Sequence, residues 1–145
     1  MRTIIAGSRT INDDTLLQEI IAEWPHRITQ VISGTARGVD ILGELWAEEH
    51  GIEVVRMPAD WNKWGKSAGY RRNEDMAKVA DAAIIIHDGK SAGTKHMLDI
   101  ARKMGLEIMY VVLAAPKYTY YPAVGEHGYI KNLDETVNDT DDIPF

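Results

Sequence analysis

The chain has 145 residues, a net charge of −6, no cysteine, and apolar and charged fractions of an ordinary globular protein. This length fits one domain with its own core, the absence of cysteine excludes a disulfide framework, and the acidity argues against nonspecific nucleic-acid binding. No apolar run approaches the roughly 20 residues of a membrane span, and the stretch before Gly7 is too short for a signal peptide. We therefore expect a cytoplasmic protein without membrane contact.

Five short apolar runs are typical of buried strands, and helical periodicity follows the first four. They cover residues 3–6, 30–32, 52–57, 82–87 and 107–113. This alternation predicts the fold class α/β, with a doubly wound, mainly parallel sheet and helices on both faces. Right-handed crossovers give the strand order 3-2-1-4-5, which makes the first and fourth strands neighbours at the switch point.

Four helices are expected between these strands. The first begins near Asp13 or Asp14, whose side chains can cap free backbone amides, and ends before Pro25. The third and fourth cover about residues 67–80 and 94–104. The second begins at about Val39, and four large apolar side chains are expected to turn it toward the core: Ile41, Leu42, Leu45 and Trp46.

Glycine-containing loops with hydroxyl groups or cations follow the first four strands. Glycine lets backbone amides approach a phosphate closely, and the next helix N-terminus adds free amides and a positive dipole. Any α/β turn favours glycine, but four such loops indicate a ligand site, with loops 7–9 and 89–94 as its two lips. Neither a Walker loop nor a dinucleotide fingerprint occurs. The ligand-binding residues expected from these loops are Gly7, Ser8, Arg9, Ser33, Gly34, Thr35, Gly38, Asp40, Gly89, Ser91, Gly93 and Thr94.

Cations and aromatic residues are interleaved between residues 56 and 72. Arg71 and Arg72 stand at a helix start, where cations oppose the helix dipole, so they indicate an anionic target that only one of them needs to face. Trp61 either stacks on a base or covers the loop. Asp40 either accepts from a ribose hydroxyl or caps the second helix. This segment adds to the expected ligand-binding residues Trp61, Lys66, Arg71, Arg72 and Asn73.

No metal site is expected, because the histidines and acids near residue 90 do not cluster. Of His87, Asp88, His96 and Asp99, only the last two share a helical face. No cofactor is indicated beyond the expected phosphorylated ligand.

Four ordered motifs resemble the SLOG superfamily, in its YspA/YpsA-related branch. They lie in residues 6–9, 33–47, 58–73 and 89–94. The resemblance implies a Rossmann-like domain that binds a nucleotide or a nucleotide-derived ligand. LOG-type relatives cleave a base from a nucleoside monophosphate with an arginine and a glutamate. Met97 stands at the glutamate position here, and the candidates for a catalytic role are Arg71, Arg72 and Asp40.

Three functions are compatible with this resemblance. We favour a sensor or binder of a phosphorylated nucleotide derivative. The first alternative is a LOG-like phosphoribohydrolase, an N-glycosidase that uses another carboxylate: Asp40, Glu44, Asp60, Glu74 or Asp88. The second alternative is single-stranded DNA binding like DNA-processing protein A, against which the net charge argues.

The chain divides into a domain over residues 1–114 and a different segment over residues 115–145. That segment is an aromatic arm followed by an acidic tail. Large side chains such as Tyr118, Tyr120 and Tyr121 favour a contact, either in a homodimer or higher homo-oligomer or folded back on the domain.

Overall fold

The computed structural model describes residues 1–113 and 117–124, which form one α/β layer structure. Its sheet has the order β3-β2-β1-β4-β5-β6. The strands are β1 (Arg2–Gly7), β2 (Gln30–Ser33), β3 (Glu53–Arg56), β4 (Ala82–His87), β5 (Glu107–Val112) and β6 (Lys117–Tyr121). The first five are parallel, in the order predicted from the sequence, and β1 pairs with β4 at the switch point.

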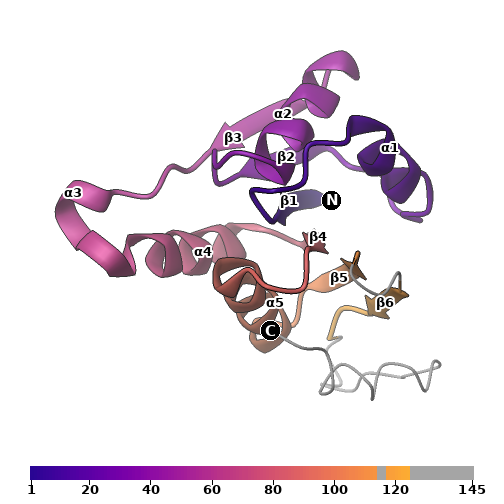
Figure 1. Cartoon of the computed structure of the whole chain (residues 1–145). Coiled ribbons are helices and arrows are strands. Elements are labelled where there is room, and N and C mark those ends of the chain that lie inside the picture. The colour runs from indigo at the N-terminus through magenta and orange to yellow at the C-terminus, as the bar shows by residue number, and fades with distance from the viewer. Residues whose placement is uncertain (114–116, 125–145) are drawn as a thin grey trace.

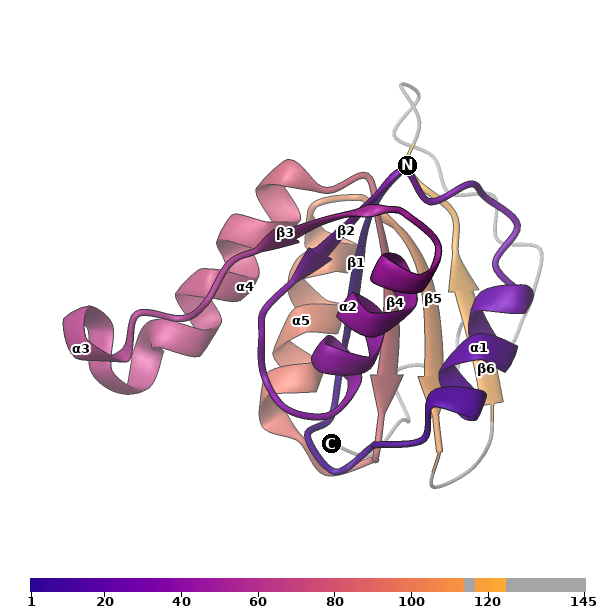
Figure 2. The ribbon, with the colours of Figure 1, turned by 90° about the horizontal axis from the view of Figure 1, so that it is seen from above.

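The helices lie on both faces of this sheet (Figures 1 and 2). They are α1 (Asp14–Ala22), α2 (Val39–Glu49), α3 (Trp61–Trp64), α4 (Ala68–Val79) and α5 (Ala92–Lys103), with a 3-10 turn over Gly65–Ser67. One core cluster joins the sheet to α4 and α5, and a second joins it to α1 and α2. Alternating strand residues feed the two clusters, Ile4 one and Ile5 the other, as expected for a sheet covered on both faces.

β6 adds a strand that the sequence analysis did not foresee. It pairs antiparallel with β5, so that Tyr121 is buried while Tyr118 and Tyr120 stay partly exposed. The sheet thus continues beyond residue 114. Residues 117–121 fold back on their own domain, which is one of the two arrangements expected for the arm. Tyr129, another tyrosine of the segment expected to form the arm, and the acidic tail lie outside the described residues. In the described part of the chain, no helix is both long and apolar enough to cross a bilayer.

The expected inward face of α2 is wrong for Ile41 and Leu45, whereas Leu42 and Trp46 are partly buried against the core as expected. The helix buries its small and acidic residues, among them Gly43, Glu44 and Ala47, whereas Ile41 and Leu45 are 38% and 50% exposed. The reason is the close approach of α2 to β1: a Cβ at Gly43 would lie 2.7 Å from the Ile5 side chain. A large side chain has no room at this distance, so small residues face β1, Leu42 and Trp46 pack partly buried, and Ile41 and Leu45 turn outward.

The segment between β3 and α4 carries α3 away from the rest of the molecule (Figures 1 and 2). Asp60 caps α3 by accepting from the backbone N–H of Lys63 at 3.0 Å. No residue of α3 is buried, and Trp61 and Trp64 are both exposed. α3 therefore adds no core and is positioned to border the carboxyl edge of the sheet.

Candidate functional site

A cavity of about 420 Å³ lies where the loops after β1, β2 and β4 meet α4 and α5. This is the carboxyl edge of the parallel strands, where ligands of doubly wound folds bind. Ten of the residues expected from the sequence line it: Gly7, Arg9, Asp40, Trp61, Lys66, Arg72, Asn73, Ser91, Gly93 and Thr94. The other seven expected residues do not line it: Ser8, Ser33, Gly34, Thr35, Gly38, Arg71 and Gly89.

The two expected lips are joined by hydroxyl groups. The Ser8 hydroxyl accepts from the backbone N–H of Asp88 at 3.0 Å and lies 3.3 Å from the hydroxyl of Thr94. The Thr94 hydroxyl donates in turn to the Ser91 hydroxyl at 2.9 Å. These hydroxyl groups therefore join the two loops, and Ser91 and Thr94 also line the cavity.

Asp88 fixes the loop before α5, together with Thr10, which the sequence analysis missed. The Asp88 carboxylate accepts from the Thr10 hydroxyl at 2.8 Å and from the backbone N–H groups of Lys90 and Ser91. Burial raises the pKa of Asp88, but these hydrogen bonds and one from Ser8 outweigh it and lower the pKa to about 2. Asp88 is thus a charged carboxylate whose two oxygens both accept hydrogen bonds, and it is suited to hold the loop in place.

Two glycines explain why the loop after β2 packs so closely on its neighbours. Gly38 has a φ of +80°, and a Cβ there would lie 2.4 Å from the carbonyl oxygen of Ser8. A Cβ at Gly34 would lie 2.8 Å or less from both Arg72 and Asp40. Gly34 therefore leaves the space in which these two opposite charges approach each other.

Arg72 connects three elements inside the cavity. Its guanidinium donates to the carbonyl of Gly34 and, at 3.1 Å, to the side-chain oxygen of Asn73. The Asn73 amide donates to the carbonyl of Gly93 at the start of α5. Burial lowers the pKa of Arg72, the charge of Asp40 raises it, and the charge of Arg9 lowers it again. Two cations therefore repel each other across one cavity.

Asp40 is the buried acid of the site. It is 4% exposed and accepts from the backbone N–H of Ala36 at 3.1 Å. Burial raises its pKa to about 6, against the lowering effect of backbone hydrogen bonds and of Arg72. Its carboxylate accepts from the loop before α2 and lines the cavity. Asp40 does not cap α2, whose N-cap is Gly38 without a side-chain cap hydrogen bond.

The other cations of residues 56–72 differ in their surroundings. Arg71 donates to the Ser67 hydroxyl, and its guanidinium lies 3.9 Å from the ring centre of Trp64, outside the cavity. Lys66 lines the cavity. Within the described residues, neither Lys66 nor Arg9 has an ion-pair partner.

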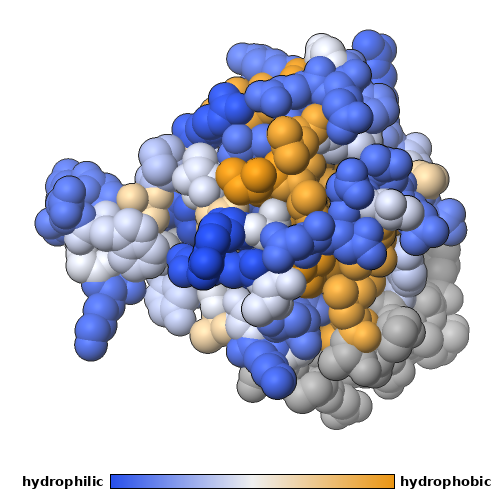
Figure 3. Space-filling view, turned by 45° about the horizontal axis from the view of Figure 1, so that its top comes forward, coloured by the Kyte–Doolittle hydropathy of each residue, from blue (hydrophilic) through white to orange (hydrophobic). Residues whose placement is uncertain are grey.

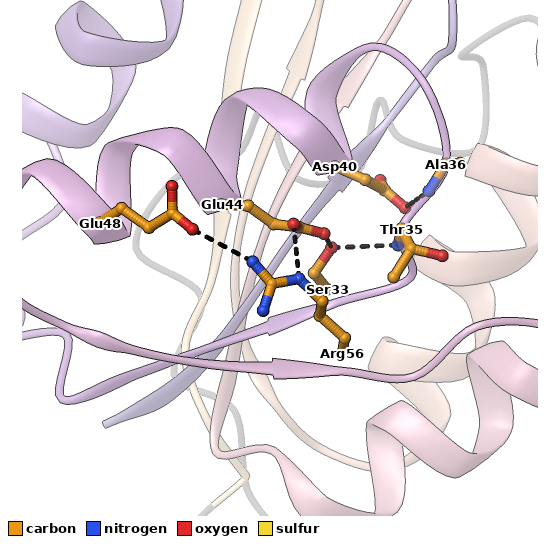
Figure 4. Close-up of polar contacts among 7 residues, drawn as sticks. All are labelled: Ser33, Thr35, Ala36, Asp40, Glu44, Glu48 and Arg56. Atoms are coloured by element: carbon orange, nitrogen blue, oxygen red, sulfur yellow. Dashed lines mark hydrogen bonds and ion pairs between the residues drawn. The ribbon is translucent and has the colours of Figure 1, made fainter.

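Arg56 belongs to a separate polar network behind the site (Figure 4). It donates to Glu44 at 2.9 Å and to Glu48 at 3.2 Å. Glu44 is buried, and its carboxylate also accepts from the Ser33 hydroxyl at 2.6 Å. The Ser33 oxygen then accepts from the backbone N–H of Thr35, which has a φ of +67°. Arg56, Ser33 and Thr35 thus hold the loop in shape.

The outer wall of the cavity is aromatic and its floor is apolar. Tyr70 stacks on His96 with ring centres 4.3 Å apart, and Trp61 borders the same opening. Met76 and Met97 are fully buried and line the floor. Met76 was missed as a lining residue, because a methionine at helical spacing is first of all a core residue.

The N-terminus of α5 adds backbone donors to the lining. The first N–H groups of a helix have no intrahelical acceptor. The Ser91 hydroxyl accepts from the backbone N–H of Thr94, and the Ser91 carbonyl accepts from that of Lys95. Of the first N–H groups of α5, that of Gly93 lies in the cavity lining, and among the described residues it has no intrahelical acceptor. In the part of the chain that the structure describes, no group of three or more metal-ligating side chains occurs.

Comparisons with known proteins agree with this architecture. The model of the YspA, cpYpsA-related SLOG family matches residues 1–64. The Gene 61 protein of Mycobacterium phage D29 is 34% identical over 117 residues, which cover 74% of this chain and 94% of that protein. The crystal structure of DNA processing protein A (DprA) from Streptococcus pneumoniae is similar in fold, with a TM-score of 0.62 at 14% identity. That likeness covers 76% of this chain, which spans half of the DprA chain.

Proposed function

This chain belongs to the YspA, cpYpsA-related SLOG family, and on that premise we propose that it binds a nucleotide or a nucleotide-derived phosphorylated ligand in the cavity. The observation that carries the proposal is the pair of cations, Arg9 and Arg72, that line one cavity and repel each other. A phosphate between them relieves this repulsion, because it supplies the negative charge that Arg9 lacks among the described residues.

The remaining groups of the cavity suit the rest of a nucleotide. The backbone N–H of Gly93 at the start of α5 and the ammonium of Lys66 add donors for the phosphate. Asp40 offers an acceptor for a ribose hydroxyl. Trp61 and Tyr70 are about half exposed at the rim, where a base can stack on them.

A phosphoribohydrolase is the second candidate function, and Asp40 is the observation that favours it. A carboxyl with a pKa of about 6 beside an arginine can act as a general acid near neutral pH. Against it stands Met97, a buried apolar side chain where LOG-type enzymes have a glutamate. We therefore place binding first.

Single-stranded DNA binding has less support. Of the five cations between Arg56 and Arg72, only Lys66 and Arg72 line the cavity. Arg56 is paired with two carboxylates, and Arg71 lies over Trp64. A groove that tracks a nucleic-acid backbone needs a longer row of available cations.

A thermal-unfolding panel tests the proposal. Nucleoside mono- and diphosphates, ADP-ribose and the matching nucleosides are added at the same concentration. A bound ligand at a hundredfold excess over its Kd stabilises the native state by about 2.7 kcal/mol. We expect at least one phosphorylated ligand to raise the Tm and its nucleoside to do much less. A panel in which no phosphorylated ligand shifts the transition overturns the proposal.

A further inference from the structure

The outer face of α2 carries an apolar patch that the ligand site does not use. Ile41 and Leu45 lie one turn apart on this helix and are among the most exposed large aliphatic side chains of the described residues. Figure 3, in which the side with α1 and α2 comes forward, shows hydrophobic residues reaching the surface between hydrophilic ones. Contiguous exposed apolar groups of this kind mark interaction surfaces.

A shallow hollow of about 380 Å³ borders this patch between α1 and α2. Its apolar lining consists of Leu17, Leu42, Leu45 and Trp46, and its rim carries Asp14, Gln18, Glu48 and Glu49. The hollow gives an approaching apolar side chain a place to be buried, so the patch is more than a flat surface.

Arg37 and Glu49, at the two ends of α2, each oppose its dipole, whereas Asp40 in the first turn complements it. Arg37 precedes the helix at its positive end, and Glu48 and Glu49 occupy its last turn at the negative end. Glu48 is paired with Arg56. Arg37 and Glu49 are exposed, and neither has an ion-pair partner within the described residues. Each of these two exposed charges can therefore take a partner of opposite charge from outside.

A second α2 that packs antiparallel satisfies both ends at once. With a two-fold axis near Gly43, Ile41 meets the partner's Leu45, and Arg37 meets the partner's Glu49. The opposed helix dipoles also attract each other in this orientation. An arrangement in which one surface fits its own copy is the condition for an isologous dimer.

We propose that the α2 face is a self-complementary dimer surface and that its occupant is the α2 face of a second copy of this chain. The apolar pair at its centre is buried against the hollow between α1 and α2, and two Arg37–Glu49 pairs border it. The proposal is independent of the ligand. It places the homodimer contact on α2 instead of on the aromatic arm, part of which pairs with β5.

Sedimentation-velocity centrifugation of the full chain tests this surface. We expect a dimer whose Kd rises about tenfold or more in Arg37→Glu and in Glu49→Arg, because each reversal brings like charges together twice per dimer. The double variant R37E/E49R restores the opposite charges, so its Kd should return toward that of the wild type. Leu45→Asp should leave only monomer, whereas Met104→Asp, at a residue of similar exposure beyond α5, should not change the Kd.

Circular dichroism of each variant confirms that it is folded. A wild-type chain that is monomeric at tens of micromolar overturns the proposal. A dimer that Leu45→Asp leaves intact, or whose single reversals the double variant fails to rescue, overturns it as well. In the latter case a basic segment of another protein becomes the better occupant of the acidic-rimmed hollow.

Discussion

The guanidinium of Arg72 donates a hydrogen bond to the backbone carbonyl of Gly34, 38 residues earlier in the chain. This contact ties the start of α4 to the loop after β2, and the absence of a Cβ at Gly34 makes it possible. The neighbouring Asn73 continues the connection to Gly93. One arginine–asparagine pair thus holds two glycine loops around the cavity, and a part of Arg72 remains available to a ligand.

Gly93→Ala separates ligand binding from folding. A Cβ at this position would meet no atom within 4 Å, and alanine favours the first turn of α5 by up to about 1 kcal/mol. The Tm should therefore stay or rise. If a phosphate approaches the Gly93 backbone, the added methyl group should lower its affinity about tenfold or more, as measured by calorimetry. Unchanged affinity would place the phosphate elsewhere.

Arg56→Ala should reduce stability without changing ligand affinity. Its loss leaves the buried carboxylate of Glu44 without its cation, which lowers the free energy of unfolding. Urea unfolding measures this cost, and Arg71→Ala is the matched control, since Arg71 pairs with no buried acid. A drop in nucleotide affinity in Arg56→Ala at unchanged stability would contradict the structural role of the network.

Asp40 should make stability fall as the pH rises from about 4 to 7. Its folded pKa of about 6 lies above the ordinary value of 3.8 because the carboxyl is buried. The native state therefore binds the proton more tightly, and its stabilising contribution is complete below pH 4 and lost as the pH rises through 6. A shift of this size corresponds to a loss on the order of 3 kcal/mol.

Asp40→Asn isolates this effect, because asparagine does not ionise. The difference in the free energy of unfolding, variant minus wild type, should increase between pH 4.5 and pH 7.5 in urea titrations. Burial lowers the pKa of His96, which acts in the opposite direction, but this contribution is common to both proteins and cancels in the difference. A difference that does not vary with pH would mean that Asp40 titrates normally.

Met97 is the residue that decides between binder and enzyme. The wild type should release no base from nucleoside monophosphates above background, since Met97 places no carboxylate on the cavity floor. Met97→Glu should increase the release, measured by chromatography, and Met97→Gln is the control of equal size. Both variants change a buried site, so their Tm is recorded first. Robust release by the wild type that Arg72→Ala abolishes would favour the hydrolase.

The parallel sheet was predictable because its strands are continuous apolar runs bounded by glycine. Val31 and Ile84, for example, lie in continuous apolar runs, which are typical of strands buried on both faces of the sheet. β6 was missed because it pairs with a neighbouring strand on one side only. In it exposed Tyr120 alternates with buried Tyr121, and the residues of this segment also fit an extended arm. The pairing with β5 is a tertiary contact that local periodicity does not encode.

The site was predictable in its glycines and cations but not in the direction of each side chain. Arg71 and Arg72 are adjacent, so helical geometry separates them by about 100°, and only one can face the cavity. The face of α2 was misjudged for Ile41 and Leu45 for a related reason: large apolar side chains normally point inward, but the close contact of Gly43 with Ile5 gives the sheet-facing side of the helix to small residues. A buried acid pair, Asp40 and Glu44, at one-turn spacing was the available signal.

Calorimetric titration of the arginine variants tests the central claim most directly. The phosphorylated ligand with the largest thermal shift is titrated into the wild type, Arg9→Ala, Arg72→Ala and Arg71→Ala. Loss of a desolvated phosphate contact should cost Arg9→Ala and Arg72→Ala about 2–5 kcal/mol of binding free energy. Arg71→Ala, whose side chain lies outside the cavity, should stay within about 0.5 kcal/mol of the wild type. Equal affinity in all four proteins, or a loss confined to Arg71→Ala, would contradict an anion site between Arg9 and Arg72.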